Sequence, residues 1–434
     1  MVQLRSWGKL YSSECELQFL DRYRLEYGLK NGKKYLVQGS ARSYGDVCLN
    51  THHTIIKSSN LNFFKSFDAE NGILICEAGV ILKDIQDTFL PRGWLLPVSP
   101  GTQLITVGGA IANDIHGKNH HIRGNFGHHI LELSLLRSDG QIYNCSRTEN
   151  TELFRATIGG IGLTGIILSA KIQLMPVSSP VLQVEYLPFR GISEFLRINS
   201  ESENKFEYTV SWIDCLSGKN VRGIFIRANH VIDQINLTPV KKQQKKIPIT
   251  PPISCINILS LKLFNQFYYN LNAQKKGKKY HQHFYDFQYP LDGIENWNVL
   301  YGKKGFYQYQ CVIPLRAAQD PIEKMLELIA KSQQGSFLVV LKAFGNIKNE
   351  GMLSFPISGI TLALDFPNLG EKTLKLFKQL DQIVLDNLGR LYLAKDARMD
   401  RKFFIETYPQ VLEFEKFRDP AISSDMALRL LGKI

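Results

Sequence analysis

The sequence has few cysteines, and none in a metal-binding arrangement. Its 434 residues include seven cysteines, and no two of them have the Cys-x-x-Cys spacing typical of zinc sites and redox motifs. An odd, scattered set also argues against a disulfide framework, which small secreted domains build from paired cysteines. The sequence therefore predicts free thiols, no zinc centre and no disulfides.

Long apolar runs are absent as well. The N-terminus, Met-Val-Gln-Leu-Arg-Ser-Trp-Gly, has no apolar signal core. No uninterrupted apolar stretch approaches the ~20 residues that a bilayer-spanning helix needs. We therefore expect no signal peptide, no transmembrane helix, and a chain that is cytoplasmic or peripheral at the inner membrane.

Acidic residues are missing from one internal stretch. Between Gln234 and Tyr285 there are nine lysines and no Asp or Glu, and an apolar and aromatic centre covers 253–271. Lysine clusters flanking such a centre are typical of elements that lie on an anionic membrane, but a solvated basic loop has the same composition. The segment near 234–285 thus predicts peripheral membrane contact, with a solvated loop as the open alternative.

The chain contains enough apolar residues to form a large hydrophobic core. Hydrophobic residues make up 44% and aromatic residues 11% of the chain, as in packed globular proteins, and its length favours two domains. The formal net charge of +12 indicates an anionic partner. No recognised nucleic-acid module accompanies this charge, so we do not expect nucleic-acid binding.

The most informative stretch is rich in glycine and amide side chains. Residues 110–127 read AIANDIHGKNHHIRGNFG, a run that suits neither a core strand nor an amphipathic helix. Glycine lets a ligand approach the backbone, and free N–H groups bind anions. A second run, QGSARSYGD at 38–46, lies upstream. Two such loops predict one dinucleotide held at its pyrophosphate and at its ring.

A third glycine run, Gly160-Ile-Gly-Leu-Thr-Gly165, matches the G-x-G-x-x-G pattern of nicotinamide-binding folds. That pattern requires a strand before it and a helix after it, whereas a helix-like segment precedes this run and β-rich residues follow. We expect the run to pack beside a different kind of cofactor site. Neither of the other loops has the Gly-Lys-Ser/Thr sequence of a P-loop, so nucleotide hydrolysis is not predicted.

Several motifs together resemble one enzyme family. They are ARSYGD at 41–46, SPGT at 99–102, VGGAIANDIHGKNHH at 107–121, GGIGLTG at 159–165, QYQ at 308–310, SFPI at 354–357, AKD at 394–396 and SDMA at 424–427. From Trp7 to the C-terminus, their order and spacing are similar to those of the decaprenylphosphoryl-β-D-ribose 2′-oxidase family, flavoproteins of the vanillyl-alcohol-oxidase type.

The resemblance implies an α+β protein with a two-domain vanillyl-alcohol-oxidase-type FAD-binding fold. Residues 1–177 and 390–434 would form the FAD-binding domain, and 178–389 an antiparallel-sheet substrate domain. It implies non-covalent FAD, because Arg42-Ser43 occupy the loop where some relatives carry a linking histidine. The implied reaction oxidises the 2′-hydroxyl of a polyprenylphosphoryl-ribose to the 2′-keto sugar. An NADH-dependent short-chain reductase would then complete an epimerisation to arabinose.

The resemblance also assigns site residues. The cofactor-binding residues would be Arg42, Ser43, Tyr44, Gly45, Gly101, Thr102, Gly108, Gly109, Asn113, His116, Gly117, Asn119, Gly160 and Gly162. The catalytic candidates are Lys395, His116, Gln310 and Tyr44, and the substrate-binding candidates are Gln308, Lys342, Trp212 and Tyr392. No metal site is expected, since His120 and His121 would point apart as neighbours in a strand.

Lys395 is the leading catalytic candidate. It lies in the strand-like segment Leu391–Asp396, where an inward-pointing charge is costly without a function. A cation there could hold the substrate or stabilise a developing alkoxide, and an ion pair with Asp396 or another acid is the alternative. His116 could move the proton, because imidazole titrates near neutrality, or could be a structural histidine beside FAD.

Three further side chains are candidates by position. Gln308 and Gln310 alternate with Tyr309 and therefore face the same side of a strand, which suits sugar recognition but also an exposed polar face. Lys342 lies inside the apolar segment 340–344 and is a candidate phosphate ligand. A surface lysine with a buried stem is the alternative.

The chain departs from the family pattern at three positions. Ala363 stands where the best-known members have a cysteine beside the flavin, and Gln288 and Val210 stand where they have tyrosine and serine. We therefore expect agents that react with that thiol to fail here, and a different substrate pocket. An FAD oxidase of another sugar alcohol or sugar lactone is the alternative enzyme, and a membrane-binding protein that keeps flavin structurally is the non-enzymatic one.

Overall fold

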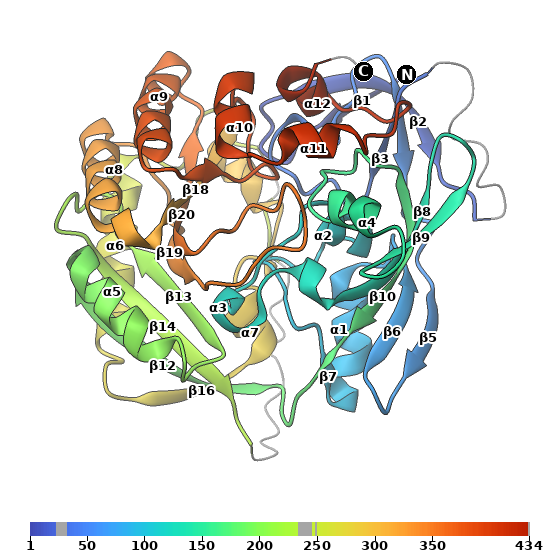
Figure 1. Cartoon of the computed structure of the whole chain (residues 1–434). Coiled ribbons are helices and arrows are strands. Elements are labelled where there is room, and N and C mark those ends of the chain that lie inside the picture. Colours follow the sequence, from blue (N-terminus) through green and yellow to red (C-terminus); the bar gives the residue numbers. More distant parts are fainter. Residues whose placement is uncertain (23–32, 233–244, 248–249, 433–434) are drawn as a thin grey trace.

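Two β-sheets from the N-terminal part of the chain lie on one side of the molecule (Figure 1). The computed structural model describes residues 1–22, 33–232, 245–247 and 250–432. One sheet has the order β1 (Val2–Arg5), β2 (Ser12–Phe19), β4 (Thr54–Lys57), β3 (Tyr35–Gln38). The other is antiparallel and has the order β5 (Phe64–Asp68), β6 (Ile73–Glu77), β10 (Ile166–Gln173), β8 (Ile130–Leu136), β9 (Ile142–Ser146).

Short helices connect these strands and carry the glycine-rich loops. They are α1 (Leu82–Phe89), α2 (Val107–Ala112), α3 (His120–Arg123) and α4 (Thr151–Thr157), and a small pair, β7 (Trp94–Leu95) with β11 (Met175–Pro176), closes this part. Helix α2 begins in the glycine-rich stretch 101–117, at the point where the Thr106 side chain accepts a hydrogen bond from the Gly109 N–H. It packs against β10, which fixes that loop on the five-stranded sheet.

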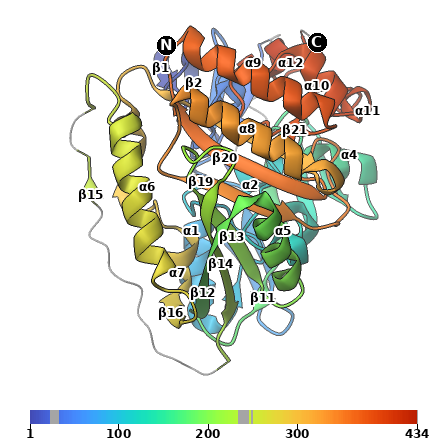
Figure 2. The same ribbon diagram turned by 90° about the vertical axis from the view of Figure 1, so that its left-hand side faces the viewer.

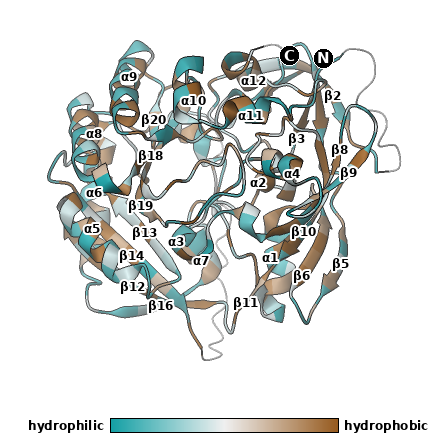
Figure 3. Cartoon of the chain, in the orientation of Figure 1, coloured by the Kyte–Doolittle hydropathy of each residue, from teal (hydrophilic) through white to brown (hydrophobic). Residues whose placement is uncertain are grey.

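An eight-stranded antiparallel sheet forms the other side of the molecule. Its order is β16 (Lys279–His283), β12 (Val181–Arg190), β14 (Arg222–His230), β13 (Tyr208–Ile213), β19 (Val339–Phe344), β20 (Gly359–Pro367), β18 (Phe306–Pro314), β21 (Arg390–Leu391). Helices α5 (Gly191–Ser202), α8 (Gln319–Ser332) and α9 (Glu371–Asp386) lie over one face, and α6 (Ile258–Ala273) packs on β12 and β14 (Figure 2). The outer helices α8 and α9 carry much hydrophilic surface, whereas strands such as β6 and β10 are mainly hydrophobic (Figure 3).

The two ends of the chain come together. The short helices α10 (Arg401–Thr407), α11 (Val411–Glu415) and α12 (Asp425–Leu430) lie beside the N-terminal sheets (Figure 1). The Arg429 guanidinium joins them, since it donates to both oxygens of Asp46 at 2.8 and 2.9 Å and to Asp396 at 2.9 Å. We therefore propose the division of 1–177 with 390–434 from 178–389. Strand β21 nevertheless pairs with β18, so the large sheet extends past residue 389.

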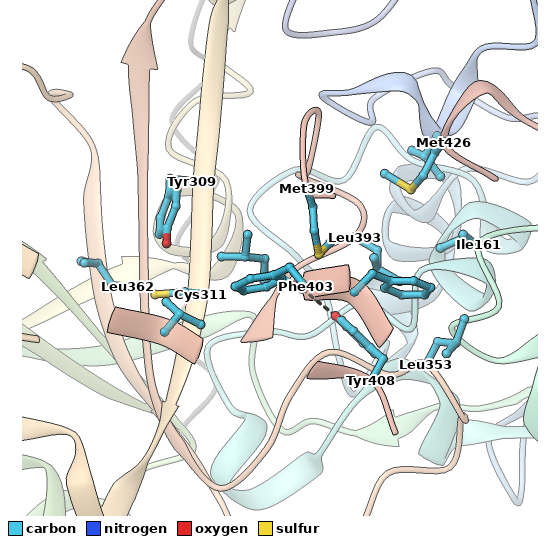
Figure 4. Packing of buried hydrophobic residues seen from close by; sticks show 14 of the residues in the cluster. Ile161, Tyr309, Cys311, Leu353, Leu362, Leu393, Met399, Phe403, Tyr408 and Met426 are labelled. Carbon is cyan, nitrogen blue, oxygen red and sulfur yellow. Dashed lines mark hydrogen bonds between the residues drawn. The ribbon is translucent and has the colours of Figure 1, made fainter. Parts of the chain in front are cut away.

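One buried apolar cluster spans both parts of this division. It contains Tyr309 and Cys311 of β18 together with Met399, Phe403 and Tyr408 of the C-terminal segment (Figure 4). The Tyr408 hydroxyl also donates to the Leu391 carbonyl at 2.6 Å. Because the core is continuous, the loops and the large sheet are held in a fixed relationship around the space between them.

Two local expectations were wrong. Lys395 is not in a strand, because β21 ends at Leu391 and the N–H groups of Lys395 and Asp396 both donate to the Tyr392 carbonyl at 3.0 Å, forming a turn. His120 and His121 lie in helix α3, not in a strand. Among the described residues, no helix is both long and apolar enough to cross a membrane.

Candidate functional site

A cavity of about 510 Å³ lies where the glycine-rich loops meet the eight-stranded sheet. Its wall is drawn from 36–48, 99–118, 161–167 and 288–297, from strands β18, β19 and β20, and from the turn that contains Lys395. Cavities of this size and mixed polarity are typical ligand sites. Segments far apart in the sequence therefore build one site.

Most of the sequence-predicted residues lie on this wall. They are Arg42, Ser43, Tyr44, Gly101, Thr102, Gly108, Gly109, Asn113, His116, Gly117, Gly162, Gln308, Gln310, Lys342, Tyr392 and Lys395. Four others do not themselves line it, namely Gly45, Asn119, Gly160 and Trp212.

The two glycines among these four serve close backbone packing. A Cβ at Gly45 would lie 1.9 Å from the Asp396 carbonyl oxygen, and one at Gly160 would lie 2.1 Å from that of Ala156. Neither position tolerates a side chain, but for a reason unrelated to ligand contact. Their direct role in cofactor binding stays a prediction.

Asn119 and Trp212 also act behind the wall. The Asn119 amide donates to the Pro97 carbonyl at 2.8 Å and to the Glu207 carboxylate at 3.0 Å. The Trp212 indole N–H donates to the Phe337 carbonyl at 2.9 Å, and its ring packs on Tyr268 at 4.7 Å. On strand β13 the Trp212 side chain thus supports the sheet and helix α6, and its contact with substrate stays a prediction.

The first loop leaves backbone donors available. After β3 ends at Gln38, Ala41 takes a left-handed conformation with φ 51°. The N–H groups of residues 40–43 donate no hydrogen bond to any other part of the described chain. Successive free N–H groups in such a turn form a concave anion site. The Arg42 guanidinium, stacked 4.2 Å above the Trp7 ring, adds positive charge beside it.

The second loop contributes space more than donors. The Gly108 N–H already donates to Ala78 at 2.8 Å and the Gly109 N–H to Thr106 at 3.1 Å. A Cβ built on Gly101 would meet no atom within 4 Å, and the same holds at Gly162, whose φ is 77°. Because both glycines line the cavity, their missing side chains leave room for a ligand against the backbone.

Several buried polar atoms on the wall lack a partner within the described residues. They are Asn113 Oδ1, His116 Nδ1, Gln288 Oε1, Gln308 Oε1 and Asp365 Oδ1. Buried polar atoms are almost always hydrogen-bonded in native proteins. Their convergence on one cavity therefore indicates a ligand with several hydrogen-bonding groups.

Lys395 is the most unusual charge on the wall. Its Nζ lies 3.9 Å from the centre of the Tyr44 ring, and burial lowers its pKa to about 8, although the nearby Asp365 carboxylate favours the charged form. The expected alternative partner, Asp396, is bound to Arg429 instead. Burial raises the pKa of Asp365 to about 7, and Lys395 opposes that rise. No carboxylate of the described chain lies within 4.0 Å of the Lys395 ammonium.

His116 is held as a neutral imidazole. Burial, with added repulsion from Lys342, lowers its pKa well below the ordinary value. Its Nε2 lies 3.1 Å from the Gln310 side-chain nitrogen, and its ring packs against Phe344 and Tyr392 at 4.9 and 5.1 Å. When Gln310 donates to Nε2, the imidazole carries its proton on Nδ1, the atom without a protein partner.

Two further lysines reach the same wall. The Lys342 ammonium donates to the Gly117 carbonyl at 2.8 Å, and that of Lys118 donates to the carbonyls of Phe287 and Gln288. Burial lowers the pKa of each to about 7. Sequence reasoning did not assign Lys118, although a lone lysine in a glycine-rich, amide-rich run was a usable signal.

Asp365 was also missed by sequence reasoning. The β18–β20 register pairs Gln308 with Asp365 and Gln310 with Ala363. Residues 363 and 365 share one face of a strand, so the position proposed for Ala363 could have identified Asp365. Ala363, Gln288 and Val210, where the chain departs from the family pattern, all lie on the cavity wall.

The cavity wall shows neither a reactive thiol nor a group of metal ligands among the described residues. Of the described cysteines, Cys48 lines the cavity, and burial raises the pKa of its thiol to about 12. All seven cysteines are free. Across the described residues, no three His, Cys, Asp or Glu side chains are grouped as metal ligands.

Comparison with known proteins gives consistent matches. Residues 23–146 match the FAD binding domain family. The chain is 34% identical over 418 residues to decaprenylphosphoryl-β-D-ribose oxidase of Mycolicibacterium smegmatis, covering 92% of this chain and 90% of that protein. It is 27% identical to an uncharacterised protein of Streptomyces coelicolor, covering 81% and 100%. L-gulonolactone oxidase of Scyliorhinus torazame is 29% identical over 40% of each chain.

Proposed function

The chain belongs to the decaprenylphosphoryl-β-D-ribose oxidase family of FAD-dependent oxidoreductases, and from this premise we propose that it oxidises the 2′-hydroxyl of a polyprenylphosphoryl-ribose to the 2′-keto sugar. One observation carries the proposal. A single cavity joins the glycine-rich loops of an FAD site to Lys395, His116 and Gln310. This combination places reactive side chains where a redox cofactor and a sugar alcohol can meet.

The residues on the wall fit FAD. The free N–H groups of residues 40–43 and the Arg42 guanidinium suit its pyrophosphate. The space beside Gly101 and Gly162 lets a flat ring lie against the backbone. The unpartnered Asn113 Oδ1 suits the polar edge of the ring. We therefore assign these residues as the cofactor contacts.

The protein's own part in the reaction is to orient the alcohol and take its proton. Bound FAD supplies the hydride acceptor for the hydrogen on the sugar C2′. In the proposed step the Lys395 amine takes the hydroxyl proton while the C2′–H bond breaks, which leaves the ketone. With a pKa of about 8, roughly a tenth of Lys395 is a neutral amine at pH 7. That fraction suffices for a general base.

His116 and the two glutamines would position the sugar. Because Gln310 occupies the His116 Nε2, the imidazole presents Nδ1–H as a donor and cannot also serve as the base in that tautomer. Gln308 and Gln310 lie on the same face of β18 and both line the cavity. Two amides on one face suit recognition of sugar hydroxyls.

Lys342 and Lys118 would hold the phosphate of the substrate. Their pKa values of about 7 mean that each is only partly charged in the free protein near neutrality. A phosphate nearby favours the charged form and would draw protons onto them. Tyr392 closes this wall from the C-terminal segment, with its hydroxyl donating to the Asn113 carbonyl at 3.0 Å.

Two relationships outside the cavity belong to the same proposal. A 2′-keto sugar needs reduction to become the arabinose epimer, so an NADH-dependent short-chain reductase is the proposed partner. The polyprenyl chain implies peripheral membrane contact, which the basic composition near 234–285 supports; residues 233–244 and 248–249 of that segment lie outside the described residues.

Anaerobic titration with a short polyprenylphosphoryl-ribose analogue, followed by flavin absorbance, tests the proposal. We expect bleaching with the ribose analogue and none with its 2′-deoxy counterpart, which lacks the reacting hydroxyl. Lys395→Met should slow bleaching, and Lys402→Met, an exposed lysine on α10, should not. Bleaching by a free sugar lactone but not by the analogue would establish the alternative oxidase. The support for that alternative is smaller, because the similarity between this chain and L-gulonolactone oxidase covers only 40% of the chain.

A further inference from the structure

Helix α6 presents a row of large apolar side chains to solvent, while others, such as Leu261, face the protein. Leu259, Leu263, Phe267 and Leu271 are 65, 66, 67 and 46% exposed. Their spacing of four residues aligns them along one face of the helix. The described chain has other exposed apolar residues, but single ones are normal, whereas a continuous stripe marks an interaction surface.

The opposite face of α6 is fixed to the protein by apolar and polar contacts. Asn265 and Asn272 are 1 and 4% exposed. The Asn265 amide donates to the Asp214 carboxylate at 2.5 Å, and Tyr268 packs on Trp212 at 4.7 Å. The helix therefore cannot roll its apolar stripe inward without breaking a buried hydrogen bond to a carboxylate.

The surroundings of the stripe are basic. Lys262 lies on α6 beside the stripe, and Lys276 and Lys278 follow the helix; all three are exposed. No Asp or Glu occurs between residues 234 and 285. Lysine is depleted from the cores of protein–protein interfaces, whereas lysine flanking an apolar stripe is the pattern of helices that lie on anionic membranes.

The stripe is also close to the site. Phe264 of α6 packs on Phe337 at 4.7 Å, and the next residue, Leu338, lines the cavity. The cavity-wall strand β17 (Ile294–Glu295) pairs in parallel with β15 (Lys245–Lys246) of the basic segment. A surface that holds α6 would therefore lie one layer of side chains away from the substrate wall.

We propose that the outward face of α6 docks on an anionic phospholipid bilayer, with Leu259, Leu263, Phe267 and Leu271 inserted at the headgroup–acyl boundary. The helix has 16 residues, roughly 24 Å, so it lies along the surface and does not span the ~30 Å hydrocarbon layer. This deepens the proposed function and rests on it for its purpose, because a polyprenyl-linked substrate is itself held in a membrane.

Vesicle co-sedimentation of the full-length, FAD-loaded protein tests this surface. We expect binding to vesicles of phosphatidylcholine with phosphatidylglycerol, and weaker binding at high salt or to phosphatidylcholine alone. The double variant L263Q/F267Q should lower the partition coefficient about a hundredfold, since each of the two buried apolar side chains is worth about tenfold. The matched control is I142Q/L412Q, which removes exposed apolar residues on β9 and α11.

The outcomes separate this inference from the proposed function. Equal binding of L263Q/F267Q and wild type, or no binding of wild type, would overturn it. A wild-type dimer that becomes monomeric in L263Q/F267Q would assign the stripe to a second copy instead. Both variants should oxidise a short, water-soluble analogue like wild type. Failure of wild type to oxidise that analogue counts against the proposed function, while vesicle binding by itself continues to support the docking surface.

Discussion

The Lys395 ammonium lies 3.9 Å from the centre of the Tyr44 ring, although the two residues come from opposite ends of the chain. The aromatic face stabilises the cation, while burial lowers its pKa to about 8. Lys395 is thus balanced between its charged and neutral forms near physiological pH. A general base needs this balance, and it makes the role of Lys395 measurable.

The rate of flavin reduction should rise with pH up to about 8 and then level off. Below its pKa, the neutral fraction of Lys395 falls about tenfold per pH unit, and only the neutral amine can accept the proton. Stopped-flow measurement under anaerobic conditions checks the profile. Lys395→Met should lower the rate by roughly 10²–10⁴ and remove the inflection. A rate that falls as the pH passes 8 would show instead that the ammonium is the active form.

Asp365→Asn should shift that inflection to lower pH. The Asp365 carboxylate favours the charged form of Lys395, so the amide removes a stabilising negative charge and the Lys395 pKa falls further. The same stopped-flow series measures the midpoint. If Asp365 had a purely structural role, Asp365→Asn would reduce the rate at every pH and leave the midpoint in place. Asp365→Glu keeps the negative charge and should largely restore the wild-type midpoint.

Binding of a phosphate-bearing analogue should weaken as the pH rises above 7. Burial lowers the Lys342 pKa to about 7, and the charged form is the one that binds phosphate. The Kd, measured from the flavin absorbance change, should increase by up to about tenfold per pH unit. Lys342→Met should bind more weakly at low pH and with a flatter profile. An analogue without the phosphate is the control, and the same steep profile in Lys342→Met would contradict the assignment.

Thiol-directed agents that attack the position of Ala363 should form no adduct with this protein. Ala363 lines the cavity opposite Gln310, and the Cys48 thiol, which also lines the cavity, stays protonated because burial raises its pKa to about 12. Intact-mass spectrometry after turnover should show unmodified wild type and one adduct in A363C. An adduct on wild type that disappears in Cys48→Ser would show that the Cys48 thiol is reactive and would contradict the prediction.

Denaturation should release the yellow cofactor. The first loop carries Arg42-Ser43 and no histidine, which is the residue that links flavin in some relatives. Acid precipitation followed by absorbance of the supernatant measures the released FAD, and we expect one equivalent. Flavin that stays with the pelleted polypeptide would show a covalent link, and peptide mapping would then distinguish His116 from Cys48, both of which line the cavity.

Much of the site could be predicted from the sequence because the signals are local. Glycine runs mark close backbone approach, and the loops at 41–44 and 101–117 do line the cavity. The two-residue period of a strand put Gln308 and Gln310 on one face, as the β18 register has them. In contrast, the period puts Trp212 on the same face of β13 as the cavity-lining Val210, and only the tertiary structure shows that its ring packs on Tyr268 of α6.

By itself, the sequence determined the glycine-rich loops, the shared strand face of Gln308 and Gln310 and the basic composition of 234–285, which follow from short-range geometry and composition, and its family resemblance implied the α+β class. Only the tertiary structure decided which charges meet. Asp365 lies near Lys395, and Arg429 binds both Asp46 and Asp396. The tertiary structure also decided that the apolar stripe of α6 faces solvent. Pairings and pKa values depend on atoms that distant segments bring together, and no local pattern encodes that neighbourhood.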